Sequence, residues 1–274
     1  MMAGMINPVE AFEHGFAKFM NVNPNEVVAV SSGSAALHIA CLLSRVKGRH
    51  VITTPFTFPA TVNAIIIAGG KPLFIDVGLD CLLNPDLVWR CISSESYDVA
   101  ALLPVHLFGR VFNINKVISQ TKEKNIRIIE DASQALGAKH GDAYAGTVGD
   151  FGTFSFYASK NLPTFEGGML LCREEGNAAE ARSLRNHGFK DGDMVSLGYN
   201  NKISWLSAFL GQQYLALHKT AIMAELGIYG MADGYYPKTV YQHTWYRDNP
   251  DKWEIYQECP IAESLAAQVR GHRK

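Results

Sequence analysis

The sequence predicts an α/β fold built around a largely parallel sheet. As far as residue 131, short apolar runs alternate with longer segments of helical spacing, which is typical of strand–helix–strand units. The runs are apolar on both faces, so helices are expected to cover the sheet on each side. With 274 residues, 47% of them hydrophobic, the chain is long enough for one large domain or for one with a small addition.

The expected strands are the apolar runs, and the expected helices are the segments of helical pattern between them. The strands are predicted at 27–30, 50–54, 72–77, 99–107 and 126–131. The helices are predicted at 34–45, 59–70, 85–91 and 113–125. The order is completed by two short strands at 151–157 and 167–172 and by helices at 178–186 and 204–219.

The character of the chain changes near Thr220. Beyond this residue, tyrosines, prolines and charged residues are frequent and periodic segments are few. We therefore predict a large domain over residues 1–219 and a small C-terminal domain over residues 220–274.

Composition argues against several classes of protein. The formal net charge is −1, and no dense Lys/Arg stripe occurs before the terminal RGHRK. We interpret RGHRK as a solvated chain end. No nucleic-acid partner is therefore expected. The five cysteines are widely spaced without a CxxC pair, which predicts reduced thiols in a cytoplasmic protein and no metal site. Neither a signal peptide nor a membrane span is expected, because the N-terminus lacks a basic region before an apolar run and residues 51–70 contain prolines and Asn63.

Three motifs follow predicted strands, where ligands bind in open α/β sheets. In SSGSAALHIA, Gly33 permits a tight turn, and Ser34 with the first amides of the helix makes an anion cradle at the positive helix end. A simple helix N-cap would use the same residues. In TPFTFPAT, Phe56 and Phe58 lie at a strand end, where either ring can stack on a planar ligand or belong to the core.

The third motif, IIEDASQALGA, ends a strand with the adjacent carboxylates Glu130 and Asp131. A carboxylate there can be a metal ligand, a general base or the partner of a cationic ring nitrogen. The alternative for Asp131 is a helix N-cap.

The stretch FYASKNLPTFEGG contains Lys160, which is either a surface lysine of a polar loop or a nucleophile. A lysine, a strand-end carboxylate, an aromatic ring and a phosphate cradle are the four parts of a pyridoxal 5′-phosphate (PLP) site. The lysine forms a Schiff base with the aldehyde, the carboxylate keeps the pyridine nitrogen protonated, the aromatic packs on the ring and the helix end holds the phosphate.

These stretches, in this order, resemble the DegT/DnrJ/EryC1/StrS family of PLP-dependent sugar aminotransferases. The resemblance covers about Val9 to Lys219. It is carried by SSGSAALHIA, TPFTFPATVNAI, KPLFIDV, PVHLFG, IIEDASQALGA, GDFGTFSFYASKNLPTFEGGMLLC, RSLRNHG and LGYNNKISWLSAFLGQQYLAL. Each motif alone is modest, but the ordered series is highly specific. It implies PLP fold type I, an aspartate aminotransferase-like large domain with a mostly parallel central sheet.

The resemblance assigns a role to residues around the cofactor ring. It implies that Lys160 is the lysine that forms the Schiff base and that Asp131 pairs with the pyridine nitrogen. It places Gln134 near the ring and its 3-hydroxyl, and it gives Phe58 the place of the family's ring-stacking aromatic.

The resemblance also assigns the phosphate contacts. It implies that Gly33, Ser34 and Ser155 hold the phosphate. Asn200, in GYNNK, matches an asparagine that usually reaches the phosphate from the neighbouring subunit, so a homodimer with shared active sites is expected.

The implied reaction is transamination, because Lys160 stands where dehydratase relatives carry histidine. The amino donor is expected to be glutamate or glutamine, and the acceptor a keto sugar linked to a nucleotide. Lys160 is also expected to shuttle the proton, which requires a lowered pKa. Two alternatives remain: a PLP-dependent dehydratase, lyase or other reaction on a different substrate, and a non-catalytic PLP-binding partner of a full-length homologue.

The resemblance weakens after Lys219. About 55 residues remain there, and YYPKTVYQHTWYR and CPIAESLAAQVRGH are similar to pieces of the family's small domain but lie too close together. A shortened C-terminal domain is therefore expected, which bears on the acceptor pocket more than on the cofactor site.

Three further residues have lesser assignments. His106 is expected to pack at a strand end rather than lie near the cofactor. His187 fits a helix end or a pocket, and Glu166 fits the site wall or a turn cap.

Overall fold

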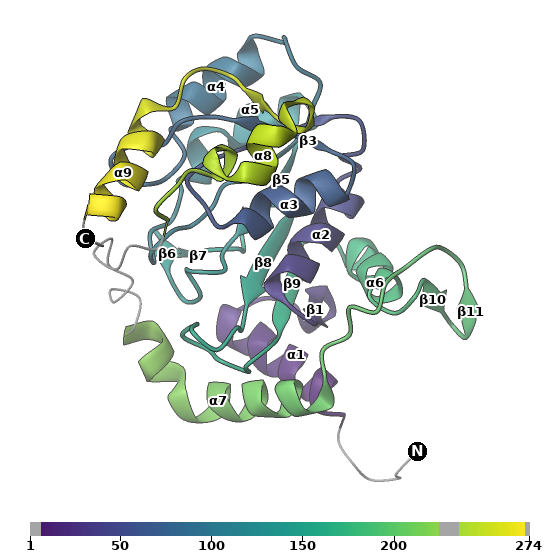
Figure 1. Ribbon diagram of the computed structural model, residues 1–274. Coiled ribbons are helices and arrows are strands. Elements are labelled where there is room, and N and C mark those ends of the chain that lie inside the picture. The colour runs from purple at the N-terminus through teal and green to yellow at the C-terminus, as the bar shows by residue number, and fades with distance from the viewer. Residues whose placement is uncertain (1–6, 225–235, 272–274) are drawn as a thin grey trace.

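The computed structural model describes residues 7–224 and 236–271 and is organised around an eight-stranded sheet (Figure 1). The strand order is β1-β9-β8-β5-β4-β2-β3-β12. The strands are β1 (Val27–Val30), β2 (His50–Thr53), β3 (Lys71–Phe74), β4 (Val99–Leu102), β5 (Arg127–Asp131), β8 (Phe151–Ser155), β9 (Gly168–Cys172) and β12 (Glu254–Ile255). Two hairpins lie outside the sheet, β6 (Lys139–His140) with β7 (Ala143–Tyr144) and β10 (Phe189–Lys190) with β11 (Asp193–Met194).

The predicted parallel character of the sheet is confirmed. All neighbouring pairs from β8 to β12 are parallel, and only β9 runs antiparallel to its neighbours β1 and β8. Because β1, β2, β4, β5 and β8 run in the same direction, their carboxyl ends meet at one edge of the sheet, where ligands bind in such folds.

Helices cover both faces of the sheet, as the apolar strands predict. The helices are α1 (Pro8–Met20), α2 (Gly33–Leu43), α3 (Pro59–Ile67), α4 (Pro85–Ser93), α5 (Ile118–Glu123), α6 (Glu175–Leu184), α7 (Trp205–Ala224), α8 (Thr244–Asp248) and α9 (Pro260–Gly271). Short 3-10 turns occur at Pro24–Glu26, Ile114–Lys116, Val240–Gln242 and Pro250–Lys252. One face packs against α2, α3 and α6, and the other against α1 with α7 and against α4 with α5.

Helix α1 was not among the expected elements. It begins after Asn7, whose side chain accepts a hydrogen bond from the amide of Val9 at 3.0 Å, and it packs along α7 (Figure 1). Phe12 and Phe16 are fully buried against the rings of β8 and the residue after it, at centroid distances from 5.1 to 5.9 Å. This aromatic spacing on one helical face is the signal that would have predicted the helix.

Several element boundaries differ from the predicted ones. β3 ends at Phe74 and β4 at Leu102, before the expected ends at 77 and 107. The helix expected at 204–219 is α7, which continues to Ala224, so the predicted domain boundary at residue 220 lies within it. The predicted division into domains 1–219 and 220–274 stays a prediction, with residues 225–235 outside the described residues.

The described part of the C-terminal segment packs on the same sheet. β12 adds to the edge beside β3, with Glu254 opposite Leu73, and α8 and α9 lie on the same side of the molecule as α3 (Figure 1). The carboxylate of Asp76 accepts hydrogen bonds from the first amides of α9, those of Ile261 at 3.0 Å and Ala262 at 2.9 Å. This segment therefore shares one hydrophobic core with α2, α3 and the sheet, and most of the predicted solvated tail at 270–274 lies outside the described residues.

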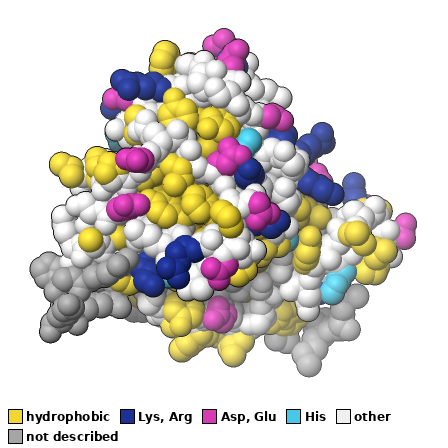
Figure 2. All heavy atoms as spheres, turned by 45° about the horizontal axis from the view of Figure 1, so that its top comes forward, with side chains coloured by type: hydrophobic (Ala, Val, Ile, Leu, Met, Phe, Trp, Pro, Cys, Tyr) yellow, Lys and Arg dark blue, Asp and Glu magenta, His cyan; other side chains and the backbone are white. Residues whose placement is uncertain are grey.

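The charges on the visible surface are mixed in sign. On the face shown in Figure 2, basic and acidic side chains are interspersed around a hydrophobic patch. Within residues 7–224 and 236–271, no helix is long and apolar enough to cross a membrane.

Candidate active site

A cavity of about 360 Å³ lies at the edge where the parallel strands end. Its walls come from the ends of β5 and β8, from the segments that follow β1, β2, β4, β5 and β8, and from Tyr236 in the C-terminal segment. Of the predicted cofactor residues, those that line it are Gly33, Ser34, Phe58, Asp131, Gln134, Ser155 and Lys160. The structure thus brings together groups that the sequence separates widely.

Helix α2 begins at this cavity. The hydroxyl of Ser32 caps the helix by accepting from the amide of Ala35 at 3.1 Å, so Ser34 is left at the cavity wall rather than serving as the cap. A Cβ on Gly33 would lie 2.7 Å from Cβ of Ser155, so only glycine lets the helix start approach the end of β8 this closely. The positive helix end and the two serines together suit an anionic group such as a phosphate.

Asp131 is the last residue of β5 and lies in the cavity wall with 4% of its surface exposed. Its Oδ1 accepts from the amide of Ser133 at 3.1 Å, and its Oδ2 accepts from the hydroxyl of Thr61 at 2.8 Å. The residues that follow form turns rather than a helix, so the alternative of a helix N-cap for Asp131 is wrong. The carboxylate is held by two donors and is open to a cationic partner in the cavity.

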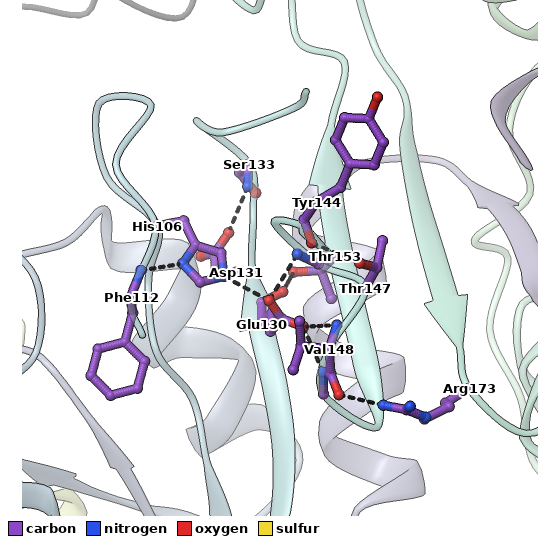
Figure 3. A network of polar contacts seen from close by, with 12 residues as sticks. His106, Phe112, Glu130, Asp131, Ser133, Tyr144, Thr147, Val148, Thr153 and Arg173 are labelled. Carbon is purple, nitrogen blue, oxygen red and sulfur yellow. Dashed lines mark hydrogen bonds and ion pairs between the residues drawn. The ribbon is translucent and has the colours of Figure 1, made fainter. Parts of the chain in front are cut away.

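Glu130, the neighbour of Asp131, belongs to a different network (Figure 3). Its fully buried carboxylate accepts from Nε2 of His106 at 2.8 Å and from three backbone amides, those of Gly146, Val148 and Gly149, at 2.6 to 2.8 Å. Burial opposes ionisation, but the hydrogen bonds outweigh it and lower the pKa of Glu130. Nδ1 of His106 accepts from the amide of Phe112 at 3.0 Å, so the ring is saturated and packs at the strand end, as expected.

Lys160 follows β8 in a turn, with its amide donating to the carbonyl of Tyr157 at 2.8 Å. Its side chain is half-buried in the cavity wall, so the surface-loop interpretation is wrong. Burial lowers the pKa of Lys160, and the negative charge of Asp131 opposes this shift. The environment therefore makes the neutral amine, the nucleophilic form, easier to reach than it is for a solvated lysine.

Gln134 is fixed at both ends of its amide. Oε1 accepts from the amide of Phe108 at 3.3 Å, and Nε2 donates to the hydroxyl of Tyr236 at 2.6 Å. Tyr236 is buried and lines the cavity, a role that the sequence did not suggest. Its partner lies 102 residues earlier in the chain, and no spacing pattern connects the two.

The two candidate aromatics of TPFTFPAT are distinguished by their burial. Phe56 is 3% exposed and packs edge-on against Tyr236 in the core. Phe58 precedes α3, is 58% exposed and lines the cavity. Phe58 is therefore the aromatic that is able to cover a planar ligand.

Asn200 does not line the cavity. It is exposed and forms an isolated antiparallel bridge with Asn186 beyond the end of α6. Its predicted contact involves a second subunit and stays a prediction. Of the two undecided residues, Glu166 lines the cavity, and His187 is exposed with a φ of 60° in the turn after α6.

In the part of the chain that the structure describes, no group of three or more His, Cys, Asp or Glu side chains is placed to bind a metal ion. All five cysteines are free and buried.

Comparison with known proteins agrees with this geometry. The model of the DegT/DnrJ/EryC1/StrS aminotransferase family matches residues 4–222. The chain is 33% identical over 208 residues to a UDP-4-amino-4,6-dideoxy-N-acetyl-beta-L-altrosamine transaminase from Campylobacter jejuni, a match that covers 74% of this chain and 55% of that protein. It is 30% identical over 214 residues to a GDP-perosamine synthase from Escherichia coli O157:H7, covering 75% and 56%. The chain thus spans about half the length of these curated relatives.

The fold has counterparts among solved structures. A DegT DnrJ EryC1 StrS aminotransferase from Brucella abortus superposes with a TM-score of 0.81 at 23% identity, covering 96% of this chain and 84% of that one. This likeness confirms the predicted fold class, and the family match confirms the resemblance that the ordered motifs indicate. The chain belongs to the DegT/DnrJ/EryC1/StrS aminotransferase family.

Proposed function

We propose that this protein is a PLP-dependent aminotransferase that moves an amino group from glutamate or glutamine to a keto sugar linked to a nucleotide. The observation that carries the proposal is the convergence of Lys160 and Asp131 on one cavity at the start of α2. The nucleotide-linked sugar is supported by the names of the relatives, a UDP-sugar transaminase and a GDP-perosamine synthase.

The cavity residues fit PLP. Gly33, Ser34 and Ser155 surround the positive end of α2 and suit the phosphate. Asp131, with its two hydrogen-bond donors, suits a protonated pyridine nitrogen. The volume of about 360 Å³ is within the range of small-molecule sites.

The ring would be held on its other sides by neutral groups. Phe58 is exposed at the cavity and suits the ring face, and Gln134 suits the hydroxyl beside the aldehyde. Because both ends of the Gln134 amide are already bonded, its position is set before the cofactor enters.

When bound, PLP supplies a reactive aldehyde and a ring that withdraws electrons from the carbon that bears the amine. Lys160 Nζ would be the group that holds the cofactor covalently, and its free amine would accept and return a proton as a general base and acid. The lowered pKa of Lys160 suits both steps. Asp131 remains an acceptor throughout and holds the positive charge of the ring nitrogen in place.

The proposal includes the subunit organisation. Asn200 contacts the phosphate held by a neighbouring subunit in a homodimer, a role supported by its exposure away from its own cavity.

The proposal also includes the domains and the compartment. Residues 1–219 form the cofactor domain, and residues 220–274 correspond to the small domain. The five free cysteines fit a reducing, cytoplasmic compartment.

The half-reaction with the amino donor tests the proposal. Protein loaded with PLP is freed of excess cofactor and mixed with L-glutamate, and 2-oxoglutarate is measured together with the absorbance of the bound cofactor. We expect one 2-oxoglutarate per site and loss of the aldehyde form, with no product from Lys160→Ala. Failure with glutamate, glutamine and other amino acids would contradict an aminotransferase and favour a non-catalytic PLP-binding partner.

The second half-reaction tests the acceptor. Protein carrying the amine form of the cofactor is mixed with UDP-linked or GDP-linked keto sugars, and the amino sugar is detected by mass spectrometry. We expect recovery of the aldehyde form with the nucleotide-linked sugar and none with the free sugar. Equal reaction of the free sugar would overturn the nucleotide requirement.

A further inference from the structure

Two buried threonines connect the β2–α3 segment to the carboxylate of Asp131. The hydroxyl of Thr61 lies 2.8 Å from Oδ2 of Asp131, and the hydroxyls of Thr57 and Thr61 lie 3.0 Å apart. Thr57 is 2% exposed and Thr61 is 1% exposed, and both line the cavity. The contact between Thr61 and Asp131 follows from no local pattern, because 70 residues separate the two.

The direction of these two hydrogen bonds follows from the number of protons that each group can donate. An ionised carboxylate only accepts hydrogen bonds, and a hydroxyl has a single proton to donate. Thr61 gives its proton to Asp131, so Thr57 must donate to the oxygen of Thr61. The two hydroxyls therefore align toward the carboxylate, and each strengthens the next in a site that is shielded from water.

The segment that carries these threonines is held from two sides. The amide of Val240, in the C-terminal segment, donates to the carbonyl of Pro55 at 2.9 Å. The hydroxyl of Tyr246 donates to Oδ1 of Asn63 at 2.5 Å. These contacts fix both ends of the turn between β2 and α3, so the hydroxyls reach Asp131 from a supported backbone.

We propose that Thr57 and Thr61 are positioning residues for Asp131, an inference that rests on the proposed PLP chemistry. They hold the carboxylate in the orientation that faces the ring nitrogen of the cofactor. Thr61 acts directly on Asp131, and Thr57 acts only through Thr61. Because Phe58 lies between them in the chain, one short segment sets both the partner of the ring nitrogen and the aromatic at the ring face.

The test compares Thr61→Val, Thr57→Val and the double variant, which keep the side-chain shape but remove the hydroxyl. The measurements are PLP affinity by absorbance titration and the pH midpoint of the bound cofactor's absorbance change. We expect Thr61→Val to weaken PLP binding by about tenfold to a hundredfold and to lower the pH midpoint, since a hydrogen bond to a charged group is lost. Thr57→Val should have a smaller effect, and the double variant should match Thr61→Val.

Two further variants separate positioning from general stability. Thr61→Ser keeps the hydroxyl and should restore the wild-type midpoint. Thr53→Val removes a comparable buried bond that does not involve the carboxylate of Asp131, from Thr53 to the carbonyl of Leu103 at 2.9 Å, and should leave the midpoint unchanged. An unchanged midpoint in Thr61→Val, or independent and additive effects of the two threonines, would overturn the proposal.

The wild-type protein distinguishes this inference from the function on which it rests. Borohydride reduction followed by peptide mapping shows whether PLP is attached at Lys160. If the wild type binds no PLP, the proposed function fails, and the role of the threonines toward the cofactor fails with it. If the wild type binds PLP and Thr61→Val behaves like it, only the positioning role fails. Urea unfolding of the cofactor-free variants gives an independent readout. The double variant should lose no more free energy of unfolding than Thr61→Val alone.

Discussion

The amide of Gln134 donates a hydrogen bond to the hydroxyl of Tyr236 at 2.6 Å, which joins the C-terminal segment to the wall of the active-site cavity. Tyr236 lies directly after residues 225–235 and beyond the region matched by the family model. The cavity is therefore built from both parts of the chain, and the C-terminal segment contributes a residue that touches the site.

Removal of this hydroxyl should loosen the cavity wall. Tyr236→Phe leaves Nε2 of Gln134 buried without this acceptor, which should lower the free energy of unfolding by about 1–3 kcal/mol. Urea unfolding measures the loss. In a Gln134→Ala background the same change should cost much less, because the donor is already gone. An equal cost in both backgrounds would contradict the coupling.

The charge of Lys160 should reduce the stability of the cofactor-free protein at neutral pH. Burial lowers the pKa of Lys160, so the folded protein binds this proton more weakly than the unfolded chain does. Lys160→Met should therefore raise the urea midpoint at pH 7. The gain should shrink as the pH rises toward the ordinary lysine value of 10.5, where the unfolded chain also loses the proton. The exposed Lys116→Met is the matched control and should show no such dependence.

The network around Glu130 should contribute strongly to stability. Glu130→Gln removes a buried charge that satisfies His106 and three amides, and should lower the free energy of unfolding by about 3–5 kcal/mol. The folded-state pKa of Glu130 lies below the ordinary value of 4.5. The ionised carboxylate therefore stabilises the wild type fully above pH 4.5, and this stabilisation is lost as the pH falls through the folded-state pKa. Urea unfolding from pH 7 downward should show the two proteins converging. The exposed Glu258→Gln should leave stability unchanged.

Shared active sites should be detectable by mixing two inactive variants. In a homodimer, Lys160→Ala and Asn200→Ala chains combine to give one intact site, with Lys160 from one chain and Asn200 from the other. Unfolding and refolding them together should restore about one quarter of the wild-type activity with glutamate, since half of the dimers are mixed and each has one intact site of two. Light scattering that shows a monomer with tightly bound PLP, or no recovery on mixing, would argue against the role of Asn200.

Much of the site was predictable because parallel strands place their carboxyl ends at one edge. Asp131 ends a strand and Gly33 and Lys160 follow strands, so the correct strand pattern already implies their convergence. The roles of these residues came from the ordered motifs, since an isolated SSGS or a lone lysine has ordinary structural explanations. The local patterns alone left Phe56 and Phe58 equivalent, and only burial separates them.

The remaining contacts depend on tertiary packing that no local pattern encodes. Thr61 reaches Asp131 across the gap between α3 and β5, and Tyr236 reaches Gln134 from the far end of the chain. The expected small domain illustrates the same difficulty. Short segments with few periodic features gave no sign that β12 would pair with β3.

The pairing of β12 with β3 also covers a strand that would otherwise form one of the two edges of the sheet. β3 is an edge strand until β12 arrives, and an unpaired parallel edge is a template for association with other chains. Lys71 at the start of β3 and Glu254 in β12 form an ion pair across this edge, although 183 residues separate them. During synthesis, nearly the whole sheet therefore emerges before its edge is covered. A chain that stalls before β12 leaves β3 as an unpaired edge strand, the kind of strand that pairs with other chains.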